Sequence, residues 1–321
     1  MPLSHRFYER LPERIRWHLL ASVTYEVFGV PVVIPRPGGD GLRPSALAAW
    51  KRHAIASLLP LTEGAFVDVG VNLGQTLVEL RSTGIPRAYV GFEPNPHCVA
   101  YVERLIEVNA YHDSTIIPVG LGDDSTVHVL YRNAADGNEM DAAATMLADL
   151  RPTRRSVARS VSVHPFDAIR SALPIKKVGM VKIDVEGVEA GTIAGMKHLL
   201  ATDRPIVMCE VLGADPAADV GAWTERARRL AATLRSVNYV VGRLIKSADA
   251  SRVEGVSPIR EFPVEAWTPE RAEEFDYVFL PRECAADVRG VFPRQTADGG
   301  DDSAWDQDAA SIESDDAAHN V

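Results

Sequence analysis

Carboxylate side chains that could do chemistry follow two apolar runs in the second half of this 321-residue chain. Residues 181–189 read Val-Lys-Ile-Asp-Val-Glu-Gly-Val-Glu. Asp184 and Glu186 are two residues apart, so they share one face while the chain stays extended. Carboxylates at the carboxyl end of a parallel strand can contact a ligand, hold a substrate hydroxyl or accept its proton. Glu210 ends the next apolar run and is a candidate for the same cleft.

A glycine-rich loop stands far upstream of these carboxylates. Residues 66–76 read Phe-Val-Asp-Val-Gly-Val-Asn-Leu-Gly-Gln-Thr, in which Gly70, Asn72 and Gly74 punctuate the passage from a strand-like run to a helical pattern. A strand, a tight turn and a helix bring a nucleotide-type ligand close to bare backbone. Asp68 at the strand end suits a cationic ligand group and disfavours a pyrophosphate. The loop therefore favours S-adenosylmethionine, which carries an ammonium group, over a dinucleotide. The cofactor contacts predicted in this segment are Asp68, Gly70, Asn72, Gly74, Gln75 and Thr76.

A third feature is Glu93, which ends the apolar run 89–92 and lies 19 residues after Gly74. Nucleoside-binding α/β units place an acidic side chain there to accept hydrogen bonds from the ribose hydroxyls. Asn95 can cap the helix that follows. Glu93, Pro94 and Asn95 are therefore predicted to contact the cofactor, although Glu93 by itself would equally suit an exposed surface.

The composition is that of a globular protein, with 46% apolar and 24% charged residues. The net charge of −10 comes mainly from residues 295–321, which hold eight carboxylates and no Lys or Arg. The rest of the chain is close to neutral, which argues against a nucleic-acid partner. The acidic segment 295–321 is expected to be a disordered tail.

Targeting signals are not apparent in the sequence. The three cysteines are isolated and show no zinc-binding or disulfide spacing, so a cytoplasmic location is expected. Charges interrupt the N-terminus, unlike a signal peptide. No run of 18 apolar residues predicts a transmembrane helix.

Residues 1–59 are expected to form an N-terminal helical extension with a linker. Residues 3–28 interleave arginines with apolar residues and predict a helix that packs on the domain. The alternative is a basic amphipathic helix that contacts a membrane surface or a partner. Residues 29–44 are rich in Pro and Gly and predict a linker, and residues 45–59 predict a second helix.

Residues 60–294 are expected to form one α/β domain. Apolar runs alternate with helical patterns, which predicts a mainly parallel sheet covered by helices on both faces. Strands are expected at residues 65–69, 88–92, 115–119, 126–131, 160–164, 178–184, 205–210, 238–245 and 276–280. Helices are expected near residues 74–82, 95–109, 165–172, 188–201 and 222–236. Residues 126–131 are expected to pair with 115–119 as a hairpin, and residues 133–159 to form a loop that covers a site.

Taken together, these motifs resemble the FkbM family of S-adenosylmethionine-dependent methyltransferases. The matching segments are DVGVNLGQT (68–76), GFEPNP (91–96), VGLGD (119–123), VKIDVEGVE (181–189) and CEV (209–211). The resemblance covers residues 60–285 and implies a class I Rossmann-like fold with a mainly parallel seven-stranded sheet and a late antiparallel strand at 276–280. It implies S-adenosyl-L-methionine as the cofactor. The implied reaction is methyl transfer to a hydroxyl of a sugar, glycolipid or polyketide-type metabolite.

The resemblance also assigns places to individual residues. The implied cofactor contacts are Asp68, Gly70, Asn72 and Gly74 at the methionine end, Glu93 at the ribose, and Gly120 and Leu121 beside the adenine. Asp184 and Glu186 match the carboxylate pair of the family, and Asp184 is also expected to contact the cofactor.

A general base is expected, because a sugar hydroxyl is a weak nucleophile and such a base contributes ~100–10,000-fold. Asp184 is the first candidate, with Glu186 and His164 as alternatives and Glu210 on the acceptor side. A lone histidine at a strand end is more commonly structural. No metal is predicted, and Mg²⁺ held by Asp184, Glu186 and Glu210 is the weaker alternative.

Two other functions fit parts of the sequence. A NAD(P)-dependent oxidoreductase would use the glycine loop, although a third glycine would be expected in it. A non-catalytic module could bind a partner through its N-terminal helix. The arginines at 151, 154, 155 and 159 suggest an anionic acceptor, such as a phosphorylated or uronic sugar, unless they form a solvated charged surface.

Overall fold

The computed structural model describes residues 22–36, 41–133, 140, 144–147, 150, 156–213, 220–263, 268, 271 and 274–292. The expected tail at 295–321, most of the expected helix at 3–28, and the arginines at 151, 154 and 155 lie outside the described residues. Within the described part, no helix is long and apolar enough to cross a membrane.

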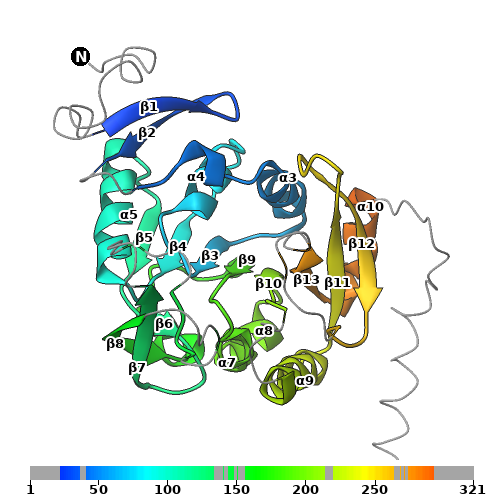
Figure 1. Cartoon of the computed structure of the whole chain (residues 1–321). Coiled ribbons are helices and arrows are strands. Elements are labelled where there is room, and N and C mark those ends of the chain that lie inside the picture. Colours follow the sequence, from blue (N-terminus) through cyan, green and yellow to red (C-terminus); the bar gives the residue numbers. More distant parts are fainter. Residues whose placement is uncertain are drawn as a thin grey trace, which may run out of the picture.

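A large mixed sheet forms the centre of the molecule (Figure 1). Its eight strands run in the order β12-β11-β13-β10-β9-β3-β4-β5. The bounds are β3 (Ala65–Val69), β4 (Tyr89–Phe92), β5 (Ser114–Ile117), β9 (Val178–Ile183), β10 (Ile206–Glu210), β11 (Tyr239–Lys246), β12 (Val253–Ile259) and β13 (Asp276–Pro281). The five strands from β10 to β5 pair in parallel, whereas β13 is antiparallel to both β10 and β11. The class I Rossmann-like arrangement and its late antiparallel strand are confirmed.

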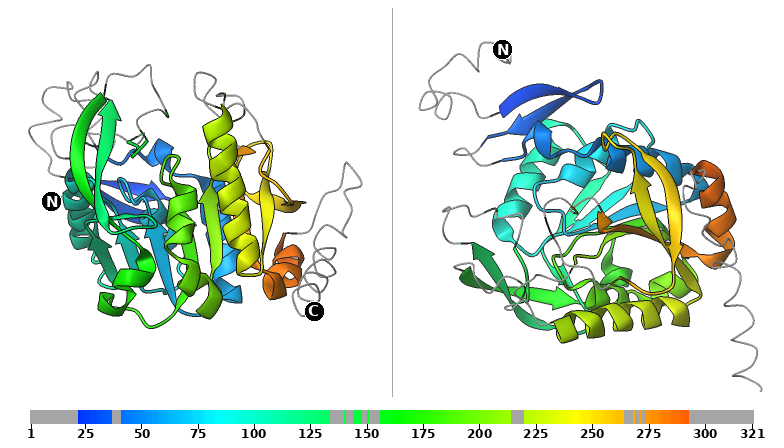
Figure 2. Two further views of the ribbon diagram at one scale, coloured as in Figure 1. Left: turned by 90° about the horizontal axis from the view of Figure 1, so that it is seen from below. Right: turned by 45° about the vertical axis from the view of Figure 1, so that its right-hand side comes forward.

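Helices cover both faces of this sheet, as Figures 1 and 2 show. One face packs against α3 (Ala49–Leu58), α4 (Gln75–Arg81), α5 (Pro96–Val108) and α10 (Ala285–Val291). The other packs against α6 (Phe166–Ile169), α7 (Glu189–Ala194), α8 (Lys197–Thr202) and α9 (Val220–Ser236). Neighbouring residues of β3 divide between the faces, since Phe66 belongs to the first core and Val67 to the second. Strands buried on both sides are mainly apolar, as β3 and β9 are apart from Asp68 and Lys182.

The N-terminal part differs from the expected helix and linker. Residues 22–27 form strand β1 (Ser22–Val27), which pairs antiparallel with β2 (Val30–Pro35). Phe28 and Gly29 connect the strands with positive φ angles of 50° and 80°, as a tight hairpin with the native twist requires. The helix prediction is therefore wrong for residues 22–28, and the linker prediction for 30–35. Both strands are rich in β-branched residues, such as Val23, Val32 and Ile34, which favour a strand over a helix.

A second, three-stranded sheet lies beside the main one. It consists of β6 (Gly120–Leu121), β8 (Ser156–His164) and β7 (Thr126–Asn133), with β8 in the middle. The predicted hairpin between 126–131 and 115–119 is wrong, because β7 pairs with β8 in antiparallel register. Part of the expected loop 133–159 is thus strand, and Thr145 joins it through a bridge to Tyr131.

Two further elements were missed at the C-terminal side. β12 is an eighth strand, beyond the seven expected, and among the described residues it pairs only with β11, at the edge of the sheet. Gly255 and Pro258 interrupt its apolar pattern, which an edge strand tolerates because one side needs no partner. α10 follows β13 after the short 3₁₀ helix η5 (Arg282–Cys284). The expected helix at 188–201 is divided into α7 and α8 near Gly195.

Candidate active site

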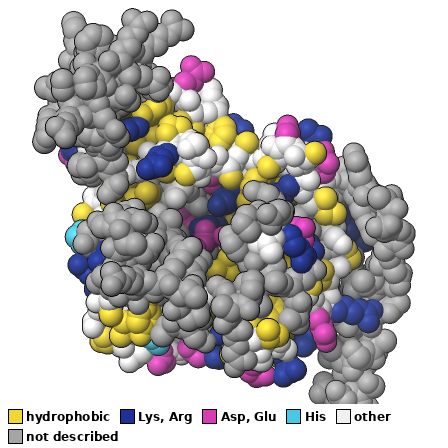
Figure 3. All heavy atoms as spheres, in the orientation of Figure 1, with side chains coloured by type: hydrophobic (Ala, Val, Ile, Leu, Met, Phe, Trp, Pro, Cys, Tyr) yellow, Lys and Arg dark blue, Asp and Glu magenta, His cyan; other side chains and the backbone are white. Residues whose placement is uncertain are grey.

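A cavity of about 290 Å³ opens at the carboxyl ends of the parallel strands. The glycine loop and β4 form one wall, and the ends of β9 and β10 form the other. In Figure 3, acidic and basic side chains meet in the hollow at the centre of this face. The predicted site residues that line the cavity are Gly70, Asn72, Gln75, Thr76, Glu93, Pro94, Asn95, Gly120, Leu121, Asp184, Glu186 and Glu210.

The glycine loop follows β3, and here the chain turns sharply close to the end of β9. Gly70 has a φ of +82°, and a Cβ atom there would lie 1.8 Å from the carbonyl oxygen of Asp184. Only glycine fits both the left-handed backbone and this close approach. The Asp184 amide donates to the Val69 carbonyl at 3.0 Å, which ties the loop to the carboxylate segment. Asn72 also has a positive φ, and its buried Oδ1 has no hydrogen-bond partner within the described structure.

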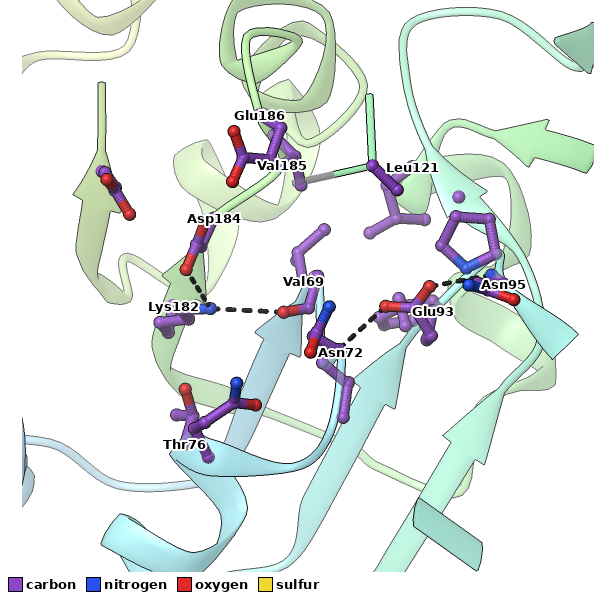
Figure 4. A pocket seen from close by; sticks show the side chains of 18 of the residues that line it. Val69, Asn72, Thr76, Glu93, Asn95, Leu121, Lys182, Asp184, Val185 and Glu186 are labelled. Atoms are coloured by element: carbon purple, nitrogen blue, oxygen red, sulfur yellow. Dashed lines mark hydrogen bonds and ion pairs between the residues drawn. The ribbon is translucent and has the colours of Figure 1, made fainter. Parts of the chain in front are cut away.

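Glu93 is held by the backbone on both sides (Figure 4). Its Oε2 accepts from the Asn72 amide and its Oε1 from the Asn95 amide, each at 2.8 Å. The residue is 7% exposed, and burial raises the pKa of Glu93 to about 7, although the two amides favour the charged form. Each carboxylate oxygen can accept a second hydrogen bond. The carboxylate is therefore oriented to receive two neighbouring hydroxyls.

Asp68 does not face the cavity. It is completely buried, accepts a hydrogen bond from the Tyr89 hydroxyl at 2.6 Å and lies 3.6 Å from the Lys182 ammonium. Its predicted contact with a cationic ligand is therefore not supported, and the argument it provided against a pyrophosphate does not hold. Gly74 is likewise absent from the cavity lining. It is the N-cap residue of α4 and packs against Leu105 of α5.

Lys182 and Asp184 form a buried ion pair at the opposite wall. The ammonium lies 3.2 Å from Asp184 Oδ2 and 3.3 Å from the carbonyl oxygen of Gly70. Burial opposes the charge of Asp184, but Lys182 and the nearby Lys51 outweigh it, so the pKa of Asp184 lies below its ordinary value. Asp184 is therefore a carboxylate at the cavity wall near neutral pH.

Glu210 and Asp276 face each other across β10 and β13 beside this pair. Burial and the charges of Asp184 and Asp276 hold the pKa of Glu210 well above its ordinary value. A hydrogen bond joins Glu210 to Asp184 and favours the charge on Asp184. Asp276 is paired with Lys246 at 2.6 Å. The pKa values of these two carboxyls are thus displaced in opposite directions, downward for Asp184 and upward for Glu210.

The loop after β9 places Glu186 at the cavity and Glu189 behind it. Glu186 has a φ of +53°, and its carbonyl accepts a hydrogen bond from the Thr145 hydroxyl at 2.6 Å. Glu189 is 6% exposed and its Oε1 accepts from the Gly187 amide at 2.8 Å. Glu189 therefore stabilises the turn before α7 and does not line the cavity.

Apolar side chains line the part of the cavity between Glu93 and the second sheet. Leu121 and Gly120 come from β6, Leu130 from β7, and Ala144 and Met146 from the segment that bridges to Tyr131. Such a surface suits a flat, weakly polar group. His164 ends β8 and is not among the residues that line the cavity, so its position does not support a role as proton acceptor.

Two basic residues at the cavity were missed from the sequence, Lys51 of α3 and Lys182 of β9. Lys182 lies in the segment VKIDVEGVE (181–189), which predicts an apolar strand. A lysine inside a buried strand is unusual, and it therefore marks a candidate site residue. Lys51 lies about 130 residues upstream of Asp184, and nothing local marks it. Arg159 of β8 contacts the ring of His97 at 3.2 Å. Among the described residues, no three His, Cys, Asp or Glu side chains are placed to hold a metal ion.

One family model and several solved structures match this chain. The family model "Methyltransferase FkbM domain" matches residues 68–241. An FkbM methyltransferase structure from Methylobacillus flagellatus KT is 15% identical, with a TM-score of 0.39, and the match covers 70% of this chain and 47% of that chain. A precorrin-6y C5,15-methyltransferase from Geobacter metallireducens GS-15 is 9% identical, with a TM-score of 0.34 and coverage of 72% and 87%. A SAM-dependent methyltransferase from Agrobacterium tumefaciens is 8% identical, with a TM-score of 0.35 and coverage of 85% and 80%. No curated protein gives a significant sequence match.

The sheet order and the carboxylate-lined cavity define a Rossmann-like nucleoside-binding protein. The family match extends over more than half of the chain, from the glycine loop to β11. The chain belongs to the FkbM methyltransferase family, whose cofactor is S-adenosylmethionine. This chain spans about half the length of the FkbM structure from Methylobacillus flagellatus.

Proposed function

We propose that this protein transfers the methyl group of S-adenosylmethionine to a hydroxyl oxygen of a sugar, glycolipid or polyketide-type acceptor. One observation carries the proposal. A single cavity has Glu93, oriented for two hydroxyls, at one wall, and the carboxyl groups of Asp184, Glu186 and Glu210 at the other. The first wall suits a ribose, and the second suits a polyhydroxylated acceptor.

The residues present fit the cofactor. Glu93 would hold the ribose hydroxyls, and the apolar residues Leu121 and Met146 would border the adenine. Asn72 Oδ1 is a buried acceptor without a partner in the described structure, and it would receive a donor from the methionine end. When bound, the cofactor supplies an electrophilic methyl group. The remaining work of the chain is to align the acceptor oxygen with it.

The proton of the acceptor hydroxyl needs a receiver as the oxygen is methylated. A hydroxyl that gains a carbon becomes strongly acidic, so even a carboxylate of low pKa can accept its proton. We assign this role to Asp184, which is ionised and lines the cavity. Glu186 and Glu210 would orient the acceptor, and the raised pKa of Glu210 favours its protonated form, which can donate a hydrogen bond.

Calorimetry with S-adenosylhomocysteine and with NAD tests the cofactor assignment. The full chain should bind the homocysteine compound and not the dinucleotide. Binding of NAD alone would overturn the proposal and indicate an oxidoreductase. Binding of S-adenosylhomocysteine without turnover on any acceptor would indicate a non-catalytic cofactor-binding module.

A screen with methyl-labelled S-adenosylmethionine tests the reaction. Sugar, glycolipid and polyketide hydroxyls are offered at equal concentration, and labelled products are sought. Asp184→Ala should lower kcat by about 100-fold or more if Asp184 receives the proton. Unchanged turnover in Asp184→Ala and in Glu186→Ala would refute the assignment of the base.

We also propose that the catalytic domain spans residues 60–294 and acts in the cytoplasm. Ala46 and Lys51 line the same cavity from outside these bounds. α3, which carries Lys51, buries Ile55 and Leu58 in the core of the domain. The segment before residue 60 is thus expected to be needed for binding, and a chain that begins at residue 60 should lose affinity for the acceptor.

A further inference from the structure

Lys182 joins the two walls of the cavity. Its ammonium lies 3.3 Å from the carbonyl oxygen of Gly70 in the glycine loop and 3.2 Å from Asp184 Oδ2. Figure 4 draws Lys182 beside Asp184, on the side toward the end of β3. The residue is only 6% exposed, so solvent does little to weaken these contacts.

A second layer of buried groups fixes Lys182 from behind. Asp68 Oδ1 accepts no hydrogen bond in the described structure, and the ammonium at 3.6 Å compensates its charge. The other oxygen of Asp68 is held by the Tyr89 hydroxyl at 2.6 Å. Asp68 and Tyr89 lie on the adjacent strands β3 and β4, although Asp68 is in register with Gly91, and both residues are fully buried. The ammonium is thus anchored before any ligand arrives.

We infer that Lys182 is a positioning residue that holds the Asp184 carboxylate, charged and in one orientation, against the end of the cofactor loop. This inference rests on the proposed function, in which Asp184 receives the acceptor proton. Lys182 contacts both the glycine loop, which would bind the methyl donor, and Asp184, which would receive the proton. The donor and the acceptor are then placed relative to each other by a single side chain.

The charged groups around Asp184 decide whether Lys182 is needed to keep its carboxyl group ionised. Those that face it are Lys51 of α3, Asp68 of β3, Lys182 of β9, Glu186 of its own loop, Glu189 of α7, Glu210 of β10 and Asp276 of β13. Five of the seven are carboxyl groups, and those that are charged oppose a further negative charge. Lys182 makes the largest favourable contribution, ahead of Lys51 and of the hydrogen bond from Glu210. Without Lys182, burial and the neighbouring carboxylates should prevail.

Titration of Asp184 in the full chain tests this inference without an acceptor. The protein is labelled with ¹³C at the aspartate carboxyls, and the Asp184 signal is assigned from the spectrum of Asp184→Asn. In the natural protein this signal should not titrate above pH ~5. In Lys182→Gln, which keeps a hydrogen-bond donor but loses the charge, its midpoint should rise by about 1 to 3 pH units.

Two variants separate charge from packing. Lys182→Arg keeps the charge and should leave the Asp184 midpoint low. Lys177→Gln makes the same change at an exposed lysine five residues upstream and should leave it unchanged. An unchanged midpoint in Lys182→Gln would overturn the inference. If that variant does not fold, titration of Asp184 above pH ~5 in the natural protein would overturn it instead.

The outcome is independent of the proposed function. Failure of S-adenosylhomocysteine to bind would refute the methyltransferase proposal and leave the titration result standing. A midpoint that stays low in Lys182→Gln would refute the role of Lys182 and leave the methyltransferase proposal intact.

Discussion

At the scale of single residues, Glu93 has two tasks that use the same two oxygens. It fixes the glycine loop through the Asn72 amide and the start of α5 through the Asn95 amide. It also presents its remaining lone pairs to the cavity. A carboxylate that is already oriented loses little entropy when a ligand binds.

Glu93→Ala should weaken the binding of S-adenosylhomocysteine by about 1–3 kcal/mol, because hydroxyls and amides would be left without their acceptor. Calorimetry at pH 8 measures the change. Glu63→Ala is the matched control, since Glu63 has an 89% exposed side chain. Equal affinity in Glu93→Ala and the natural protein would contradict the assignment of the ribose contact.

The pH dependence of binding follows from the same residue. Burial raises the pKa of Glu93 to about 7, and only the ionised form accepts from two hydroxyls with both oxygens. Affinity for S-adenosylhomocysteine should therefore fall as the pH drops from 8 to 6. Glu93→Gln should bind more weakly at pH 8 and show a flatter profile. A profile that remains steep in Glu93→Gln would assign the dependence to another group.

At the scale of elements, the turn from β3 to α4 is the most constrained connection of the site. Gly70→Ala should lower the free energy of unfolding by more than about 3 kcal/mol, because the new Cβ would overlap the Asp184 carbonyl in addition to the strained φ. Gly84→Ala provides the matched control, since Gly84 also has a positive φ but nothing within 4 Å of its Cβ position.

Urea denaturation of both variants measures the difference. Gly84→Ala should lose only about 1 kcal/mol, the cost of the left-handed backbone for alanine. Equal losses in the two variants would show that backbone strain alone limits this turn. The close approach of Gly70 to the Asp184 carbonyl would then add nothing to the loss in free energy of unfolding.

Elements with strong local patterns could be predicted from the sequence, and those defined by distant partners could not. The buried strands β3, β9 and β10 are mainly apolar, and the residues at or just after their carboxyl ends mark the cavity. β7 and β8 pair across the intervening segment, which no local pattern encodes. Lys51 reaches the cavity only because α3 packs on the sheet. The sequence predicts that Asp68 contacts the ligand, whereas the side chain is buried behind Lys182. An acidic residue near a strand end can point to either face of the sheet, so the sequence alone does not decide.

At the scale of the whole molecule, burial of carboxyl groups should make stability depend on pH. Burial raises the pKa values of Glu79, Glu93 and Glu189 to about 7 from an ordinary value of 4.5. Between these two values the folded state binds more protons than the unfolded state. The free energy of unfolding should therefore fall as the pH rises from about 4.5 to about 7.

Glu79 offers the clearest single test, because it is fully buried and does not line the cavity. Its Oε1 accepts from the Ala48 amide at 2.7 Å, a bond that glutamine can retain. Glu79→Gln should remove up to about 3 kcal/mol of the pH-dependent loss. Chemical denaturation at pH 5, 6 and 7 measures the slope. A slope equal to that of the natural protein would show that Glu79 stays ionised when folded.

The position of β13 has a consequence for how the chain assembles during synthesis. β11 and β12 leave the ribosome before β13, yet β13 lies between β11 and β10 in the finished sheet. The β11–β12 hairpin therefore has no neighbouring strand in the main sheet until residue 281 has emerged. Asp276, which faces Glu210, arrives with the same strand. A nascent chain should thus be unable to complete its main sheet until residue 281 has emerged, and until then the edge of β10 stays open to wrong partners.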